Sequence, residues 1–301
     1  MASLGSLSPA VSARDRAWLE ARAWLAVGDA HRLVFDLVAA EEALANAAVL
    51  LVDPEAPSEL RAELAWMRSG LRRYQRRLPE ALAFADEAVD LCPAQGGARV
   101  MALLMRGQVW SSLGESAQAA NDCRAAVEEL GPAAEPYCRL SAVQNLALAL
   151  MECGCVEEAR KYLAEAKALV AAMGQPEPRW HVQWVEGLLA AKCGREEEAK
   201  MCLKAAQAGF ELGQDAWHAA IVALDLAMVW LRQTGDGEAL RILAKVLPHL
   251  ATFRFEAEGL VALKLLQKAA GEGRANIDLL EQVRRSARRM PSAQLAASSD
   301  R

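Results

Sequence analysis

The chain has 301 residues, 53% of them apolar and only 5% aromatic, and its 34 basic and 39 acidic side chains give a formal net charge of −5. This balance argues against a nucleic-acid-binding surface as the main purpose, because such a surface needs clustered positive charge. No uninterrupted apolar run reaches the roughly 18 residues that a membrane span needs, so we expect no membrane partner. The abundance of Ala, Leu, Glu and Arg, all good helix formers, predicts an all-α protein.

The N-terminal part of the chain predicts a short leader followed by two helices. Residues 1–11 are small and polar, and they lack the basic start and apolar core of a secretion signal, so we expect a disordered leader. Ser12 and Asp15 have the spacing of a capping box that opens the first helix. A helical hairpin over about 13–53 should follow, and Pro54 should end it because proline cannot continue a helix.

Further helical hairpins are expected along the chain, with proline and glycine at their joins. Together with the first they would form a single domain over 12–290, followed by a flexible tail at 291–301. In the second hairpin Arg76 stands where the pattern calls for a turn glycine. The later hairpins are expected at about 58–93, 97–131, 136–173, 178–213 and 215–251, with capping helices within 254–289.

A repeat with a period of forty residues carries this prediction. Apolar residues at spacings of three and four precede each turn glycine, and glutamates follow it at the positive end of the next helix. A single hairpin cannot bury its apolar stripe, so neighbouring hairpins must stack on both sides. The first copy comprises Leu146, Ala147, Leu150, Gly154, Glu157, Glu158, Ala159, Leu163 and Ala166. The second comprises Glu186, Gly187, Ala190, Gly194, Glu197, Glu198, Ala199, Leu203 and Ala206.

The order of small and large apolar residues in these copies resembles the tetratricopeptide repeat (TPR) family. A third copy comprises Gly107, Trp110, Gly114, Ala119, Cys123 and Ala126. The resemblance covers about residues 13–270, although the family's usual period is about thirty-four, and the segment 137–270 also looks like long-period bacterial TPR proteins. It implies a right-handed α-solenoid of about six TPR-like hairpins with C-terminal capping helices.

The same resemblance implies a set of partner-binding residues. In TPR arrays the first helix of each hairpin lines a concave groove, and the corresponding side chains here suit an extended or helical peptide. Trp66 and Trp184 fit packing between hairpins equally well. The clamp for a terminal carboxylate, which chaperone-tail TPR domains build from Lys or Arg and Asn, is absent at the matching positions. The implied groove residues are Trp66, Arg73, Leu104, Gln108, Gln144, Leu148, His181, Trp184, Leu188, Lys192, Met228 and Arg232.

No pattern in the sequence predicts catalysis, a metal or a cofactor. Cys153 and Cys155 flank a turn glycine, but a tetrahedral metal site would need two further ligands, so we interpret them as small apolar residues. The four histidines are scattered, and no phosphate-binding loop or nucleophile elbow occurs. Asn145 and Asp225 occupy equivalent places near the groove, where buried polar groups must be hydrogen-bonded, so we expect them to connect adjacent hairpins.

These features predict a non-catalytic protein-interaction module, a scaffold or adaptor that holds a peptide segment or another protein in its groove. The alternative is a sensory or regulatory TPR subunit of a bacterial signalling or defence system, which binds a peptide or effector protein and passes the signal on in trans. An odd count of seven cysteines favours reduced thiols in a bacterial cytoplasm. Partner identity and oligomeric state stay open.

Overall fold

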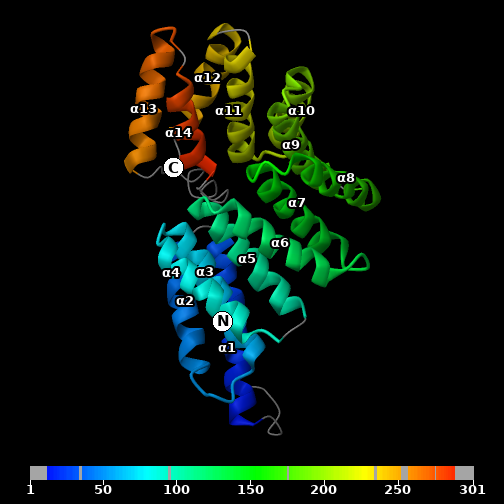
Figure 1. The fold of residues 1–301 in the computed structure, drawn as a ribbon. Coiled ribbons are helices and arrows are strands. Elements are labelled where there is room, and N and C mark those ends of the chain that lie inside the picture. Colours follow the sequence, from blue (N-terminus) through cyan, green and yellow to red (C-terminus); the bar gives the residue numbers. More distant parts are fainter. Residues whose placement is uncertain are drawn as a thin grey trace. The chain divides into compact units, whose positions relative to one another are not determined.

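The described part of the chain is built from α-helices that run antiparallel in consecutive pairs (Figure 1). The computed structural model describes residues 12–33, 36–93, 96–174, 176–233, 236–251, 257–274 and 276–288. No strand occurs among these residues, and the prediction of an all-α fold of TPR-like hairpins followed by C-terminal helices is confirmed. The expected leader and tail lie outside the described residues.

The chain divides into two compact units, residues 1–134 and 135–301. Within the first unit, each hairpin packs on the next, and the first helices of successive hairpins also touch one another. The expected single domain over 12–290 stays a prediction. The helices of the first unit are α1 (Ala13–Leu33), α2 (Leu37–Leu50), α3 (Ser58–Tyr74), α4 (Leu78–Leu91), α5 (Gly97–Leu113) and α6 (Ser116–Leu130).

The second unit continues the pattern for three hairpins and then departs from it. The last helix packs against α11, while the helix before it packs against α12, so the final pair is placed differently from the regular hairpins. The helices of this unit are α7 (Pro136–Glu152), α8 (Val156–Met173), α9 (Pro176–Lys192), α10 (Glu196–Leu212), α11 (Ala216–Gln233), α12 (Asp236–Leu250), α13 (Ala257–Gly271) and α14 (Ile277–Arg288).

The forty-residue repeat has a direct structural cause in the turns of two hairpins. Gly154 and Gly194 adopt φ angles of 81° and 71°, in the left-handed region that a residue without Cβ enters at no steric cost. Four residues before each glycine lies a buried apolar side chain of the first helix, and Ala159 and Ala199 are buried where the second helix approaches it. Arg76, which replaces the turn glycine, adopts the left-handed conformation with a φ of 60°.

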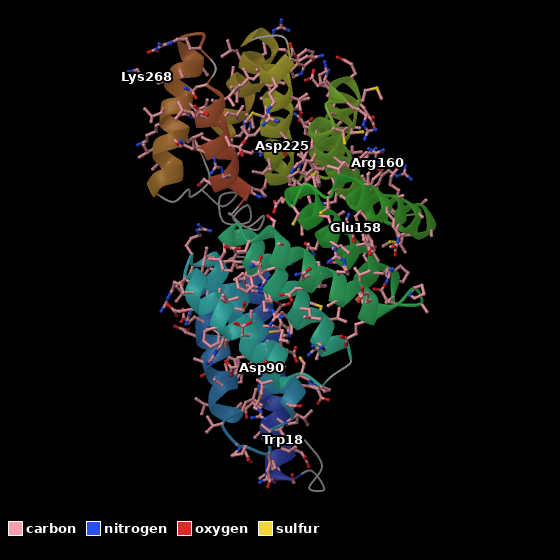
Figure 2. All side chains as sticks on the ribbon, in the orientation of Figure 1. Trp18, Asp90, Glu158, Arg160, Asp225 and Lys268 are labelled. Carbon is pink, nitrogen blue, oxygen red and sulfur yellow. The ribbon has the colours of Figure 1, made fainter. Side chains whose placement is uncertain are left out.

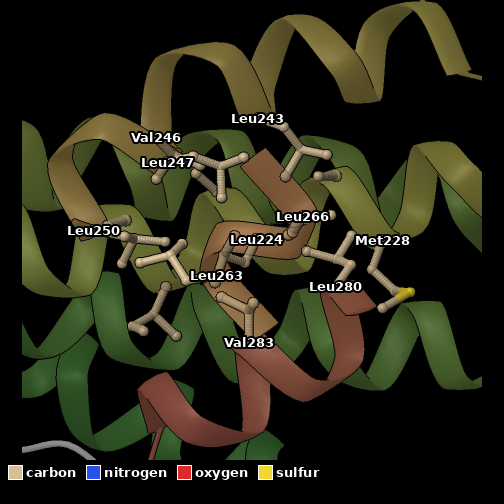
Figure 3. Close-up of a cluster of buried hydrophobic side chains, with 14 of the residues drawn as sticks. Leu224, Met228, Leu243, Val246, Leu247, Leu250, Leu263, Leu266, Leu280 and Val283 are labelled. Atoms are coloured by element: carbon tan, nitrogen blue, oxygen red, sulfur yellow. The ribbon is translucent and has the colours of Figure 1, made fainter. Parts of the chain in front are cut away.

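Separate apolar cores stabilise the two units. In the first unit, Leu25, Leu44 and Leu71 are almost wholly buried in a cluster that joins α1, α2 and α3. In the second unit one cluster joins α9, α10 and α11, and another joins α11 to α12, α13 and α14 (Figure 3). Burial of this apolar surface is the main favourable contribution to folding.

Candidate functional site

The sequence-predicted groove residues all lie on first helices of hairpins. We call the contacting first helices α1, α3 and α5 the first-helix row of the first unit, and α7, α9 and α11 the first-helix row of the second. Because successive first helices touch, side chains on the same row can meet although they are about one repeat apart in sequence.

In the first unit the structure brings two predicted residues together. Arg73 on α3 donates a hydrogen bond from Nη2 to Oε1 of Gln108 on α5, at 3.2 Å. The Arg73 guanidinium also lies over the ring of Tyr74, 4.6 Å from its centroid, where a cation is attracted to the aromatic face. Burial, together with the nearby charges of Arg32 and Arg76, lowers the pKa of Arg73.

The other two predicted residues of this row belong to the apolar interior. Trp66 is half-buried and packs against the cluster formed by α1, α2 and α3. The partner contact expected of Leu104 stays a prediction, and its side chain is only 5% exposed. The physical reason is that successive first helices approach closely enough for apolar side chains between them to be buried against each other.

In the second unit His181 and Trp184 of α9 belong to a cluster of rings. The His181 ring lies 4.8 Å from both the Phe210 ring of α10 and the His218 ring of α11, edge-on to each. Phe210 and His218 are stacked at 5.0 Å, and Trp184 meets the edge of His218 at 6.0 Å. Edge-to-face and offset arrangements of this kind add to the stabilisation from burial alone.

Asp215 fixes one histidine of this cluster. Its Oδ2 lies 2.5 Å from His218 Nδ1, and its Oδ1 accepts a hydrogen bond from the His218 backbone amide, which caps the start of α11. Burial acts to raise the pKa of Asp215, but these hydrogen bonds outweigh it and the pKa is lowered. Burial, followed by the charge of His218, lowers the pKa of His181 to about 4, so His181 is neutral near pH 7.

Asp225, which is labelled in Figure 2, joins three helices through its hydrogen bonds. It is 2% exposed on α11, and it accepts hydrogen bonds from Trp184 Nε1 of α9 at 2.7 Å and from Arg284 of α14 at 2.9 Å. The prediction that Asp225 connects adjacent hairpins is therefore confirmed. Asn145 differs, because its amide donates to the Ser141 carbonyl in its own helix, at 3.0 Å.

The C-terminal helix α14 changes the role of another predicted residue. Met228 is 2% exposed and lies in the same cluster as Leu224 of α11 and Leu280 and Val283 of α14 (Figure 3). The partner contact expected of Met228 stays a prediction, and in this structure side chains of α14 pack in the same cluster as Met228. The repeat pattern alone predicted capping helices but did not indicate that one of them would lie against α11.

The remaining predicted residues keep polar or partly exposed surface. Gln144 of α7 has a buried Nε2 with no hydrogen-bond partner among the described residues. Lys192 Nζ donates to the Met151 carbonyl, which links α9 to α7. Leu148 and Leu188 are half-buried, and Arg232 is exposed in the last turn of α11.

Sequence reasoning missed several members of the ring cluster, namely Phe210, Asp215 and His218. A signal was present: His218 follows His181 by nearly one repeat period, and Asp215 precedes His218 by three residues, the spacing of an N-terminal cap. Within the described residues, no group of three His, Cys, Asp or Glu side chains is placed to hold a metal ion. None of the helices described combines the length and the apolar character needed to cross a membrane.

Paired helices stacked through contacting first helices define the class of TPR-like helical-repeat folds, and solved structures agree. The apo form of RapI superposes with a TM-score of 0.66 at 16% identity, covering 90% of this chain and 98% of that one. The Rap conjugation gene regulator of plasmid pLS20, in complex with the Phr* peptide, has a TM-score of 0.59 at 16% identity and covers 96% of this chain and 80% of that one.

A tetratricopeptide repeat protein from Parabacteroides merdae ATCC 43184 gives a TM-score of 0.55 at 17% identity, over 90% of this chain and 99% of that one. The sequence matches no family model, and no curated protein matches it either. The likeness therefore establishes a TPR-like fold for this chain, as the repeat pattern predicted.

Proposed function

We propose that this chain is a non-catalytic module that binds a peptide segment or a protein partner along its first-helix rows. The observation that carries the proposal is the presence of buried, unused hydrogen-bond donors on these rows, Gln144 Nε2 and Arg73 Nε. A buried donor without an acceptor costs about 1–3 kcal/mol, which a peptide carbonyl or carboxylate would recover if the half-buried side chain turned towards it on binding. The similar Rap regulator in complex with the Phr* peptide supports a peptide as the ligand class.

A second candidate is a regulatory subunit that passes a peptide signal on to a partner in trans, and the likeness to that conjugation gene regulator favours it. The two candidates differ in what binding does to the chain. A regulator should gain stability with its peptide, by about 3 kcal/mol at a hundredfold excess over Kd, whereas a scaffold for folded proteins should gain little from isolated peptides. We place either activity in a bacterial cytoplasm, where the seven free cysteines would stay reduced.

The experiment that tests peptide binding is selection of random octapeptides by display on the purified chain, followed by fluorescence polarisation with the selected peptides. Replacing Gln144 by alanine should weaken binding about tenfold, because the unused donor is lost. The matched control is Gln118→Ala, which removes an exposed amide from the second helix α6. Equal Kd values for the wild type and Gln144→Ala, with unchanged circular dichroism, would contradict the proposed site.

A further inference from the structure

The turn between α7 and α8 carries two cysteines on its surface. Cys153 and Cys155 flank Gly154, and all three residues are exposed. Two other cysteines, Cys92 and Cys123, do lie in the interior, where burial raises the pKa of the Cys123 thiol to about 12 and keeps the sulfur inert. A small apolar side chain is used to fill space inside a protein. Packing therefore does not explain the exposed pair, although the sequence interpretation assigned it that role.

The backbone of this turn brings the two cysteines close together. Gly154 has a φ of 81°, and its amide donates a hydrogen bond to the Met151 carbonyl at 3.1 Å. The amide of Cys155 donates to the Leu150 carbonyl at 2.9 Å, which completes the pair of bonds that ends a helix at a left-handed residue. A residue with helical dihedral angles of either hand places the Cα atoms of its two neighbours about 5.4 Å apart. Disulfides span Cα separations of roughly 4.4–6.8 Å, so Cys153 and Cys155 lie within disulfide reach.

The next hairpin repeats the same turn with a single thiol. Gly194 has a φ of 71°, and the amide of Arg195 donates to the Ala190 carbonyl at 2.9 Å. Cys193 precedes this glycine, and Arg195 stands where the second cysteine would be. Cys155 and Arg195 each begin the second helix of their hairpin, with φ angles of −79° and −88°. The chain thus contains a dithiol turn and a matched monothiol turn of the same geometry.

We propose that the Cys153-Gly154-Cys155 turn is a thiol–disulfide exchange site that reacts with small disulfides, such as glutathione disulfide, and closes into an intrachain disulfide. One cysteine thiolate attacks a sulfur of glutathione disulfide, so that a mixed disulfide forms and one glutathione leaves as its thiolate. The thiolate of the other cysteine then attacks the protein sulfur of the mixed disulfide, and the second glutathione leaves. The two cysteines together lose two electrons and two protons, and glutathione disulfide is reduced to two molecules of glutathione.

The product is a disulfide that spans one residue on an exposed turn, where a thiol can attack it again. Exposed disulfides are the labile and regulatory ones. Such a bond is compatible with the reducing compartment proposed for this chain, because disulfides there are transient and serve catalysis or redox sensing. The site goes beyond peptide binding and does not depend on it.

The direct test treats the reduced full chain with glutathione disulfide, alkylates the remaining thiols and analyses tryptic peptides by mass spectrometry. The peptide 140–160 contains both cysteines of the turn and no other. It should lose the mass of two hydrogens and resist alkylation, whereas any glutathione taken up by Cys193 should stay bound. Dithiothreitol should then restore both alkylation sites. Full alkylation of peptide 140–160, or glutathione retained on it, would overturn the proposal.

Three variants test the cause of ring closure. Cys153→Ser and Cys155→Ser each leave one thiol in the turn, and each should stop at the mixed disulfide. Arg195→Cys completes the second turn and should allow it to close in the same way. Glutathione retained on the turn of Arg195→Cys would contradict the role of the shared turn geometry. Disappearance of the mixed disulfide from either serine variant would show that a cysteine elsewhere is the natural partner, and the proposal would fail.

Two measurements on the oxidised chain show whether the bond forms within the folded turn. Circular dichroism should give the same helical signal before and after oxidation, because the turn already holds the two cysteines within reach. A non-reducing gel should show a single chain. A loss of helical signal would mean that the bond forms only when the hairpin opens, and a cross-linked dimer would mean that the thiols pair between chains. Either result would reject the assignment.

Discussion

His181 is held neutral by its neighbours, and this affects the stability of the folded chain. The side chain lies among Phe210, His218 and Trp184. The nearby charge of Asp215 acts to raise the pKa of His181 but does not outweigh burial. With a folded pKa of about 4 against an ordinary value of 6.5, the unfolded chain takes up a proton at a higher pH than the folded chain does. Stability contributed by the neutral ring is therefore complete above pH 6.5 and is lost as the pH falls from 6.5 towards 4.

Replacing His181 by phenylalanine should remove most of this pH dependence while keeping a ring in the cluster. The wild type should lose on the order of 2–3 kcal/mol of unfolding free energy between pH 7 and pH 4.5, and His181→Phe should lose distinctly less. Urea unfolding at both pH values measures the difference. Asp215, whose pKa is lowered, titrates below this window and acts as a constant background in both proteins. Parallel pH profiles would show that His181 is not the group responsible.

At the scale of helices, the packing of α9 against α10 depends on two glycines, which have no side chain to occupy the space between the helices. A Cβ atom added at Gly209 of α10 would lie 2.2 Å from Cδ1 of Trp180 on α9, and one at Gly213 would lie 2.5 Å from the same indole. Trp180 also meets Phe210 edge-on, with ring centroids 6.0 Å apart. The indole therefore fills the space above the two glycines and anchors the hairpin.

Gly209→Ala should destabilise the chain by about 1–3 kcal/mol, because the indole must leave its rotamer or the helices must separate. This cost should outweigh the higher helix propensity of alanine, which favours the variant by about 1 kcal/mol. The control is Gly97→Ala in α5, where nothing lies within 4 Å of the added atom. Urea unfolding followed by circular dichroism compares the two, and a stabilised Gly209→Ala would refute the close packing.

The hairpins and their close-packing alanines could be predicted from the sequence, because the spacing of Gly154, Ala159 and Leu163 recurs forty residues later and each position has one physical role. The candidate site was harder to predict. The pairing of Arg73 with Gln108 depends on how far apart α3 and α5 lie, and the burial of Met228 depends on where α14 packs. Neither follows from the repeat, since the repeat describes a hairpin and its regular neighbours only.

At the scale of the molecule, the two compact units each have their own buried clusters. A segment with its own apolar core should fold alone. We therefore expect residues 135–301, expressed separately, to be helical and to unfold cooperatively. The matched control is residues 135–212, which lack α11 and with it part of both buried clusters of this unit. Cooperative urea unfolding is expected for the longer fragment only, and non-cooperative unfolding of both would argue against independent cores.

The indole of Trp180 over Gly209 and Gly213 has a consequence for how this chain diverges among species. A mutation that adds a methyl group at either glycine is tolerated only if the residue at position 180 becomes smaller, and a smaller residue there leaves a cavity that the added atoms can fill. Positions 180, 209 and 213 should therefore covary in orthologous sequences. A larger side chain at 209 or 213 should accompany a smaller one at 180.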